Sequence, residues 1–187
     1  MRTELQKKAA MFHAVNDISM HGEIAVFGST FMANFPFYEL SKKYLMENAV
    51  YNRSVEDLTL LEAEEILDDC ILELKPEKIF LALGETDLDN PSAMSVYSRI
   101  LRKIQSKLPA AKIYVLPVQK DTFSKNEESR VAFNKNLRAL SERLHVTFLD
   151  LPDLAPSNVL YEKIFKRLGC FFRKSPLTFT EAFSYGG

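Results

Sequence analysis

The sequence predicts an α/β fold: a single domain over residues 1–187, built as a three-layer α/β/α sandwich around a five-stranded parallel sheet. Two observations predict it. Short apolar runs, typical of strands that are buried on both faces, recur along the whole chain. Stretches with one apolar face at helical spacing separate these runs, which favours parallel strands joined by crossover helices. No linker, internal repeat or low-complexity segment interrupts the alternation.

The charge balance argues against two classes of partner. The chain has 24 Lys and Arg against 25 Asp and Glu, so its formal net charge is −1. Because there is no basic excess, we expect neither nucleic acid nor a membrane as a partner.

The two cysteines, Cys70 and Cys170, form neither a disulfide framework nor a metal-ligand spacing. We therefore expect no cofactor and no metal.

The sequence also bears on the compartment. The first residues lack the apolar stretch of a signal peptide, and no apolar run is long enough to cross a bilayer. These two observations predict a cytoplasmic protein.

The N-terminal stretch, residues 2–18, is predicted as a helix or an arm within residues 1–20. Its apolar residues Leu5, Ala9, Phe12 and Val15 fall at helical spacing. This apolar face can cover the chain's own domain, or it can dock on a second copy. The sequence leaves these alternatives open.

The first strand is predicted over Ile24–Phe27, followed by Gly28 and by two hydroxyl residues, Ser29 and Thr30. Gly28 has no Cβ, so the backbone can turn sharply there. Ligands of open α/β sheets bind at the carboxyl ends of the strands. The two hydroxyls are therefore predicted to stand at the ligand-binding edge. The alternative is that they only cap the helix that follows.

The next elements follow from turn and cap residues. Pro36 can open a helix that carries Leu40, Tyr44 and Leu45 on one face, and a short second strand is predicted at Ala49–Tyr51.

A helix is predicted to start at the sequence Thr59-x-x-Glu62, which has the form of a capping box. Pro76 helps to stop this helix. Its predicted buried stripe is Leu60, Ala63, Leu67, Cys70, Ile71 and Leu74.

The second half of the chain repeats the pattern. Asn90 and Pro91 suit the cap and first position of one helix, and a long helix with Val131 turned inward is predicted from about Lys125 to Leu144. A helix capped by Ser157 should end just before Gly169, and Thr178-x-x-Glu181 offers a last capping box. The remaining strands are predicted at Lys78–Leu83, Lys112–Pro117 and Val146–Leu149.

Five pieces of the chain, in this order and spacing, resemble the SGNH, or GDSL-type, hydrolase superfamily of esterases, lipases and acylhydrolases. They are IAVFGST, VYNRSVEDLT, KPEKIFLALGETDL, PAAKIYVLPV and VTFLDL. The resemblance covers roughly Ile24 to the C-terminus and implies a flavodoxin-like sheet. It also implies acyl transfer, in which a serine attacks an ester, a histidine takes its proton, an aspartate orients the histidine, and nearby donors hold the oxyanion.

The chain departs from the family's pattern at each catalytic position. Alignment puts Thr30 at the nucleophilic serine and Ser29 at the aspartate before it. Ser54 stands at the glycine of the second block, Asp57 near its second glycine, and Thr86 at the asparagine that donates to the oxyanion. The side-chain oxygens of Ser54 and Thr86 are therefore candidates for the oxyanion or ligand cleft.

The last block of the family, Asp-x-x-His before a C-terminal helix, corresponds by alignment on Pro176 to FFRKSPLTFTEAF. This alignment puts Phe172 at the aspartate and Ser175 at the histidine, with Arg173 between them. Neither Phe172 nor Ser175 can act as a base near neutral pH. Sheet topology predicts that two of the three histidines, His21 and His145, lie at the opposite, amino-terminal edge. His13 lies on the N-terminal stretch, whose docking the sequence does not fix.

Two functions follow from the resemblance. The first is a hydrolase-fold protein whose triad has degenerated and whose cleft binds a ligand, such as a small anion, or a partner protein. Its cleft would be lined by Ser29, Thr30, Ser54, Thr86 and the last block's Arg173 and Ser175. The alternative is an active esterase or acylhydrolase that uses Thr30 or Ser29, with a base that the sequence does not identify.

Three further groups of residues each allow a functional and a structural interpretation. Glu85, Asp87 and Asp89 are either a cation site or a solvated loop with a helix cap. Arg173 and Lys174 bind an anion or form a solvated surface. The third group lines an acyl pocket or belongs to the core, and consists of Phe31, Phe35, Phe37, Phe171 and Phe172.

Overall fold

A computed structural model describes residues 3–46, 48–120, 126–153 and 157–172 of the chain. It contains one five-stranded sheet in the order β2-β1-β3-β4-β5, and every neighbouring pair is parallel. The predicted fold class is therefore confirmed, and each strand lies close to its predicted bounds. The strands are β1 (Ile24–Gly28), β2 (Val50–Asn52), β3 (Lys78–Ala82), β4 (Lys112–Val115) and β5 (Thr147–Phe148).

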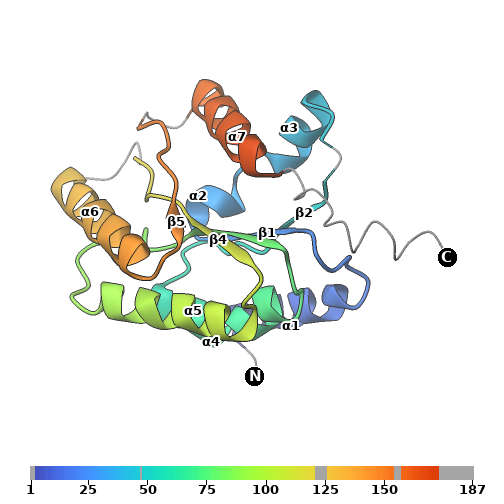
Figure 1. Ribbon diagram of the computed structural model, residues 1–187, viewed down its shortest axis with the longest axis horizontal. Helices are drawn as coiled ribbons and strands as arrows, with labels where there is room; N and C mark the ends of the chain where they lie inside the picture. The colour runs from blue at the N-terminus through green and yellow to red at the C-terminus, as the bar shows by residue number, and fades with distance from the viewer. Residues whose placement is uncertain (1–2, 47, 121–125, 154–156, 173–187) are drawn as a thin grey trace.

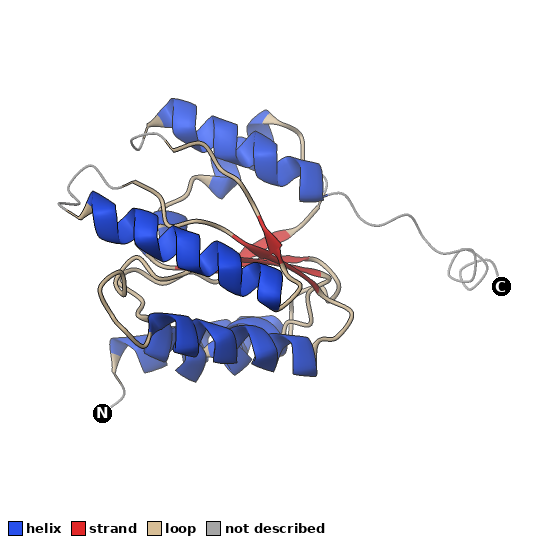
Figure 2. Cartoon of the chain, turned by 60° about the vertical axis from the view of Figure 1, so that its left-hand side comes forward, coloured by secondary structure: helices blue, strands red, loops and turns tan. Residues whose placement is uncertain are grey.

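Helices cover both faces of the sheet (Figures 1 and 2). One layer holds α1 (Glu4–Asn16), α4 (Leu60–Glu65), the short π-helical segment η1 (Asp68–Leu72) and α5 (Ala93–Lys107). The inner side of α6 (Glu127–Arg143), beside β5, packs into the same core. The other layer holds α2 (Thr30–Ala33), α3 (Phe37–Lys43) and α7 (Asn158–Phe172).

The alternation of side chains along β1 contributes to both cores. Successive residues of a strand point to opposite faces. Ala25 and Phe27 of β1 therefore belong to the core under α1, α4 and α5. Ile24 and Val26 belong to the core under α3 and α7. All four side chains are buried, which explains why this strand reads as a continuous apolar run.

The N-terminal helix α1 packs on its own domain. Ala9 and Phe12 are buried in the first core, and the Asn16 side chain donates to the backbone oxygen of Asp69 at 2.6 Å. Thr3 and Gln6 form a capping box at the start of the helix. Of the two roles that the sequence left open for this apolar face, covering the chain's own domain is the one that the structure contains.

The helix predicted to begin at Thr59 is present, but it is divided. The capping box between Thr59 and Glu62 forms with both of its hydrogen bonds. The helix α4 then ends at Glu65, and the wider turns of η1 follow. A π-helical turn inserts one residue per turn relative to an α-helix, which spacing arguments alone do not reveal. All six residues of the predicted stripe are nevertheless buried.

Four predictions about helix details were wrong. Leu45 is 85% exposed with φ +48°, because α3 ends at Lys43. Val131 is 54% exposed, because Phe133, Leu137 and Leu140 carry the inner face of α6. The cap of α5 is Ser92, and Asn90 instead accepts the Ser92 N–H at 2.9 Å. The last described helix continues past Gly169 to Phe172. The predicted capping box at Thr178 and Glu181 lies outside the described residues.

Candidate functional site

A cleft of about 380 Å³ opens at the carboxyl edge of the sheet. Its walls come from the start of α2, the loop after β2, the loop after β3, the loop after β4, and one side chain each from α6 and α7. This is the edge at which open α/β sheets bind ligands. The polar residues that line it are Thr30, Asn34, Asp57, Glu85, Thr86, Gln119, Lys120 and Arg130.

The two predicted hydroxyls have different environments. Ser29 is fully buried, its Oγ has no hydrogen-bond partner among the described residues, and it makes no capping bond to α2. Thr30 lines the cleft. Gly28 before them is required by close packing, because a Cβ there would lie 2.7 Å from the backbone oxygen of Ala82. Thr30 is therefore the hydroxyl that a ligand in the cleft can reach.

The hydroxyl of Thr30 is held by Asp57 from the loop after β2. Thr30 Oγ1 donates to Asp57 Oδ1 at 3.2 Å, and the backbone N–H of Asp57 donates to Thr30 Oγ1 at 2.9 Å. Asp57 adopts the left-handed backbone region, with φ +53°. This region is costly for most side chains but is visited by Asp and Asn.

The first turn of α2 is already capped by a carboxylate. Both oxygens of Glu85, in the loop after β3, accept the backbone N–H of Phe31, at 3.1 and 3.3 Å. A carboxylate is favoured there because the first N–H groups of a helix have no partner within the helix. An anionic ligand at this N–H would therefore have to displace Glu85.

The two other predicted oxyanion donors do not converge on Thr30. Thr86 lines the cleft, but its Oγ1 lies 3.1 Å from the Leu58 backbone oxygen and 3.1 Å from Asp87 Oδ2, so its hydroxyl donates toward the loop. Ser54 is buried, its Oγ has no partner among the described residues, and it lines a separate hollow beside α1.

The three acidic residues after β3 do not form a common cation site. Asp87 is buried and accepts the Leu60 N–H at 2.9 Å, which ties this loop to the start of α4. Asp89 accepts hydrogen bonds from Asn126 and Ser129 at the start of α6. Because Glu85 accepts the Phe31 N–H of α2, each of the three carboxylates makes hydrogen bonds to the start of a different helix: α2, α4 or α6. The interpretation as a loop of helix caps is the one that the contacts favour.

Two cations, Lys120 and Arg130, also line the cleft, and sequence reasoning did not find them. Arg130 of α6 is buried and donates to Glu127 at 2.6 and 3.1 Å and to Asp153 at 2.8 Å. The hydrogen bond to Glu127 raises the pKa of Arg130. The hydrogen bond from Arg130, with a smaller contribution from the charge of Lys120, lowers the pKa of Glu127. Nothing in the helical pattern of α6 distinguishes Arg130 from the surface cations around it.

All three histidines lie away from the cleft. His13 on α1 has Nδ1 2.6 Å from Glu73 Oε2, and this hydrogen bond raises the pKa of His13. His21 has Nδ1 3.0 Å from the Leu74 backbone oxygen, just before β3. His145 follows α6, is exposed and precedes β5. The positions of His21 and His145 agree with the prediction from sheet topology.

Two of the predicted cleft residues, Arg173 and Ser175, lie outside the described residues. Phe172, which alignment put beside them, ends α7 and packs against Phe80 with 5.4 Å between ring centroids. The family's last block stands before a C-terminal helix. In this structure the helix that follows β5 is α7, and the segment between them is residues 150–157. Its described part carries Asp153, which holds Arg130.

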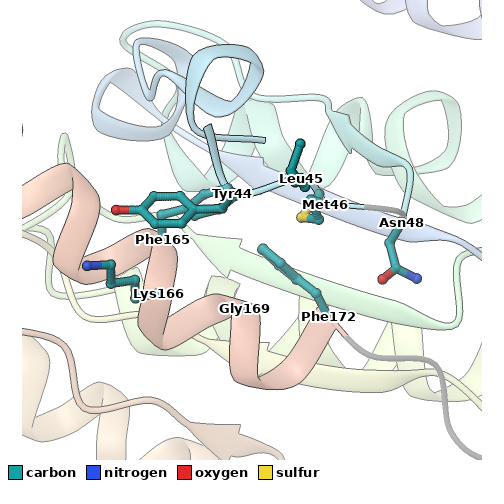
Figure 3. A pocket seen from close by; sticks show the side chains of 8 residues that line it. All are labelled: Tyr44, Leu45, Met46, Asn48, Phe165, Lys166, Gly169 and Phe172. Carbon is teal, nitrogen blue, oxygen red and sulfur yellow. The ribbon is translucent and has the colours of Figure 1, made fainter. Parts of the chain in front are cut away.

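A second hollow, of about 440 Å³, lies between the end of α3 and α7 (Figure 3). Tyr44, Leu45 and Met46 form one wall, and Phe165 and Phe172 form the other. It contains none of the predicted hydroxyls. Phe35, Phe37 and Phe172 belong to the second core, whereas Phe31 lines the cleft at the carboxyl edge.

One group of described residues has ligand atoms close enough together for a metal ion. His13 on α1, Asp69 on η1 and Glu73 just after η1 have these atoms within 4.8 Å of one another. The group lies in the helix layer opposite α2 and α7, so it is not part of the cleft. The thiol of Cys70 nearby is buried, which raises its pKa to about 12.

The chain was compared with protein families, curated sequences and solved structures. Neither a protein-family model nor a curated sequence matches the chain. Solved structures do match. A candidate platelet activating factor from Streptococcus pneumonia is 20% identical with a TM-score of 0.76, over 91% of this chain and 93% of that one. A GDSL-like lipase from Bacteroides thetaiotaomicron is 8% identical with a TM-score of 0.72, over 88% and 96%.

A lipase/acylhydrolase from Enterococcus faecalis is 15% identical with a TM-score of 0.65, over 83% of this chain and 100% of that one. The chain has the SGNH, or GDSL-type, hydrolase fold. At these identities the likeness to SGNH-type structures establishes the fold, and the chemistry has to be argued from the cleft. Among the described helices, none is long and apolar enough to span a membrane.

Proposed function

We propose that this SGNH-fold protein binds a small ligand in the cleft beside Thr30 and does not hydrolyse esters by a histidine-assisted mechanism. The observation that carries the proposal is the location of the imidazoles. The chain has three histidines, all within the described residues, and none of them lines the cleft. In the triad mechanism the imidazole must lie within hydrogen-bond reach of the nucleophile.

The environment of Thr30 supports the same proposal. A hydroxyl is a weak nucleophile until a base takes its proton. The group that accepts this proton in a hydrogen bond is the carboxylate of Asp57. A solvent-exposed carboxylate is a far weaker base than the alkoxide it would have to generate, so it is a poor general base for an alcohol. The oxyanion would also meet the carboxylate of Glu85 at the first turn of α2.

The test is hydrolysis of p-nitrophenyl acetate and butyrate by the wild-type chain and by Thr30→Val, which has nearly the same shape without the hydroxyl. We expect the two proteins to give the same rate. A rate that Thr30→Val removes, in a variant that is still folded by circular dichroism, would overturn the proposal.

One contact favours a second candidate function. The 3.2 Å hydrogen bond from Thr30 Oγ1 to Asp57 Oδ1 joins a nucleophile to a base, as an active esterase would require. If this pair performs the chemistry, Asp57→Asn should remove the same activity as Thr30→Val. Asp57→Asn keeps the backbone N–H that also bonds Thr30, so it separates the base from the structural contact.

A further inference from the structure

We propose that the chain binds a Zn²⁺ ion between α1 and η1, in the helix layer opposite α2 and α7. The ligands are Nδ1 of His13 and one carboxylate oxygen each from Asp69 and Glu73. Three protein ligands leave one position of a tetrahedral ion open for water. The site is separate from the cleft, so this inference goes beyond the proposed function and does not depend on it.

The donor atoms already lie at nearly the spacing that the ion requires. Zn–N and Zn–O bonds of about 2.0–2.1 Å at a tetrahedral angle put two donors about 3.3 Å apart. Nδ1 of His13 lies 2.6 Å from Glu73 Oε2 and 3.7 Å from Asp69 Oδ1. One ligand atom of each residue lies within 4.8 Å of the other two. Side-chain rotations are therefore enough to bring the three donors around one ion.

The two carboxylates have little positive charge of their own. Among the described residues, the imidazole of His13 is the only basic group that forms an ion pair with Asp69 or Glu73. The hydrogen bond and charge of Glu73 raise the pKa of His13, the charges of Asp69 and Asp17 add to this, and no cation of the described chain opposes them. An imidazole carries at most one positive charge. Negative charge is therefore left over to attract a divalent ion.

The backbone that carries the ligands is fixed by other contacts. Phe12 is buried in the core, and the Asn16 side chain donates to the Asp69 backbone oxygen at 2.6 Å. In the π-helical turn of η1, the Glu73 N–H donates to the Asp68 oxygen at 3.1 Å. Turns of this kind are rare and are frequent at functional sites. Because the two elements are already packed together, binding an ion costs little conformational entropy.

A hollow of about 270 Å³ opens beside the ligands. His13 and Asp69 line it, together with Gln6 of α1 and Glu65 of α4. The side chain of His13 is 60% exposed, and those of Asp69 and Glu73 are 40% exposed. An ion can therefore reach the three donors from solvent and keep a water in its fourth position.

The donor set indicates the class of ion. Imidazole nitrogen is a ligand of Zn²⁺ and of its neighbours in the first transition row, whereas Mg²⁺ and Ca²⁺ prefer about six or more oxygen ligands. The expectation of no metal rested on the two cysteines. Sequence spacing could not reveal this site, because His13 and Glu73 are 60 positions apart in the chain.

The test is isothermal titration calorimetry of Zn²⁺ into the full-length chain at pH 8, where protons compete less for the imidazole. A Cys170→Ser background removes an exposed thiol that would also bind Zn²⁺. We expect one ion per chain. Mg²⁺ and Ca²⁺, titrated in the same way, should bind at least about tenfold more weakly.

Each ligand is then removed singly by His13→Gln, Asp69→Asn or Glu73→Gln. All three side chains are partly exposed, so the variants should fold, which circular dichroism checks. Each should weaken Zn²⁺ binding at least about tenfold, because a site with three protein ligands loses one of them. The matched control is His145→Gln, the same change at an exposed histidine after α6, which should bind Zn²⁺ like the background protein.

A second measurement follows from the position of the ion between two elements of the folded chain. Zn²⁺ should raise the melting temperature of the background protein and of His145→Gln, because it binds the folded state. It should leave the melting temperature of His13→Gln almost unchanged.

Four results would overturn the inference: no binding of Zn²⁺, equal affinity for Mg²⁺ or Ca²⁺, an unchanged affinity in any of the three ligand variants, or an equal loss in His145→Gln. None of them bears on the cleft. Turnover of p-nitrophenyl esters that depends on Thr30 would overturn the proposed function and would leave the metal site as it is.

Discussion

Thr30 and Asp57 exchange two hydrogen bonds across the cleft: the hydroxyl donates to Oδ1 at 3.2 Å, and the Asp57 backbone N–H donates to that hydroxyl at 2.9 Å. The pair joins the first residue of α2 to the loop after β2. Asp57 holds a left-handed backbone, with φ +53°, while it makes this contact. The Thr30 hydroxyl is therefore part of a structural contact between the start of α2 and the loop after β2.

The first prediction concerns this contact. Thr30→Val should lower the free energy of unfolding by about 1 kcal/mol, because the Asp57 N–H and carboxylate each lose a hydrogen-bond partner. Thr30→Ser, which keeps the hydroxyl, should lose less. Urea denaturation of the three proteins measures both effects. Equal stability of the wild type and Thr30→Val would show that the contact contributes nothing.

The second prediction compares two glycines. Gly28→Ala should destabilise the protein by about 1–3 kcal/mol, because the added Cβ would lie 2.7 Å from the Ala82 oxygen and 2.9 Å from Met32 Cβ. Gly169→Ala should stabilise it by about 0.5–1 kcal/mol, because a Cβ there meets nothing within 4 Å and alanine favours the helix α7. Thermal denaturation should move in opposite directions for the two variants; a shift of the same sign would contradict this reading of the two sites.

The fold was predictable because its signals are local. Each strand is a short apolar run, and the capping box at Thr59 fixed the start of α4. The predictions of helix bounds were wrong where the local sequence does not determine the backbone conformation. Leu45 continues the apolar spacing of α3, but its backbone has a positive φ and lies outside the helix. The residues of η1 continue the buried stripe of α4, but their hydrogen bonds are π-helical instead of α-helical.

The site was less predictable because it depends on contacts across the sheet. The end of the first predicted strand placed Thr30 at the cleft, the resemblance to the SGNH family placed Thr86 there, and sheet topology placed two histidines at the opposite edge. It could not show that Glu85 caps α2 or that Arg130 reaches the cleft from α6, because each contact joins residues on different elements. Ser29 and Thr30 are adjacent in sequence, yet only the structure shows that the first is buried.

The third prediction concerns pH. The hydrogen bond from Glu73 raises the pKa of His13 above its usual 6.5. A raised pKa in the folded state means that the pair stabilises the fold fully below pH 6.5 and loses this contribution as the pH rises through the folded-state pKa. Glu73→Gln should therefore lower the melting temperature more at pH 5.5 than at pH 9. High salt should shrink the difference, since His13 is exposed.

The fourth prediction concerns Arg53, which ties α1 to the sheet. Its guanidinium lies between the rings of Phe12 and Tyr51, at 5.1 and 5.4 Å from their centroids, and donates to Asn16 Oδ1 at 3.2 Å. Burial lowers the pKa of Arg53, and its Nε has no hydrogen-bond partner among the described residues. The charge is thus incompletely compensated, while the packing between the two rings is extensive.

Packing should therefore decide the effect of substitutions at Arg53. Arg53→Ala leaves a cavity between the rings and should cost about 2–4 kcal/mol of unfolding free energy. Arg53→Met fills much of that space without burying a charge and should cost about 1 kcal/mol or less. Urea denaturation, with hydrogen exchange of the α1 amides, measures both variants. If Met were as destabilising as Ala, the hydrogen bond to Asn16 and the charge itself would hold α1 in place, and the packing would be secondary.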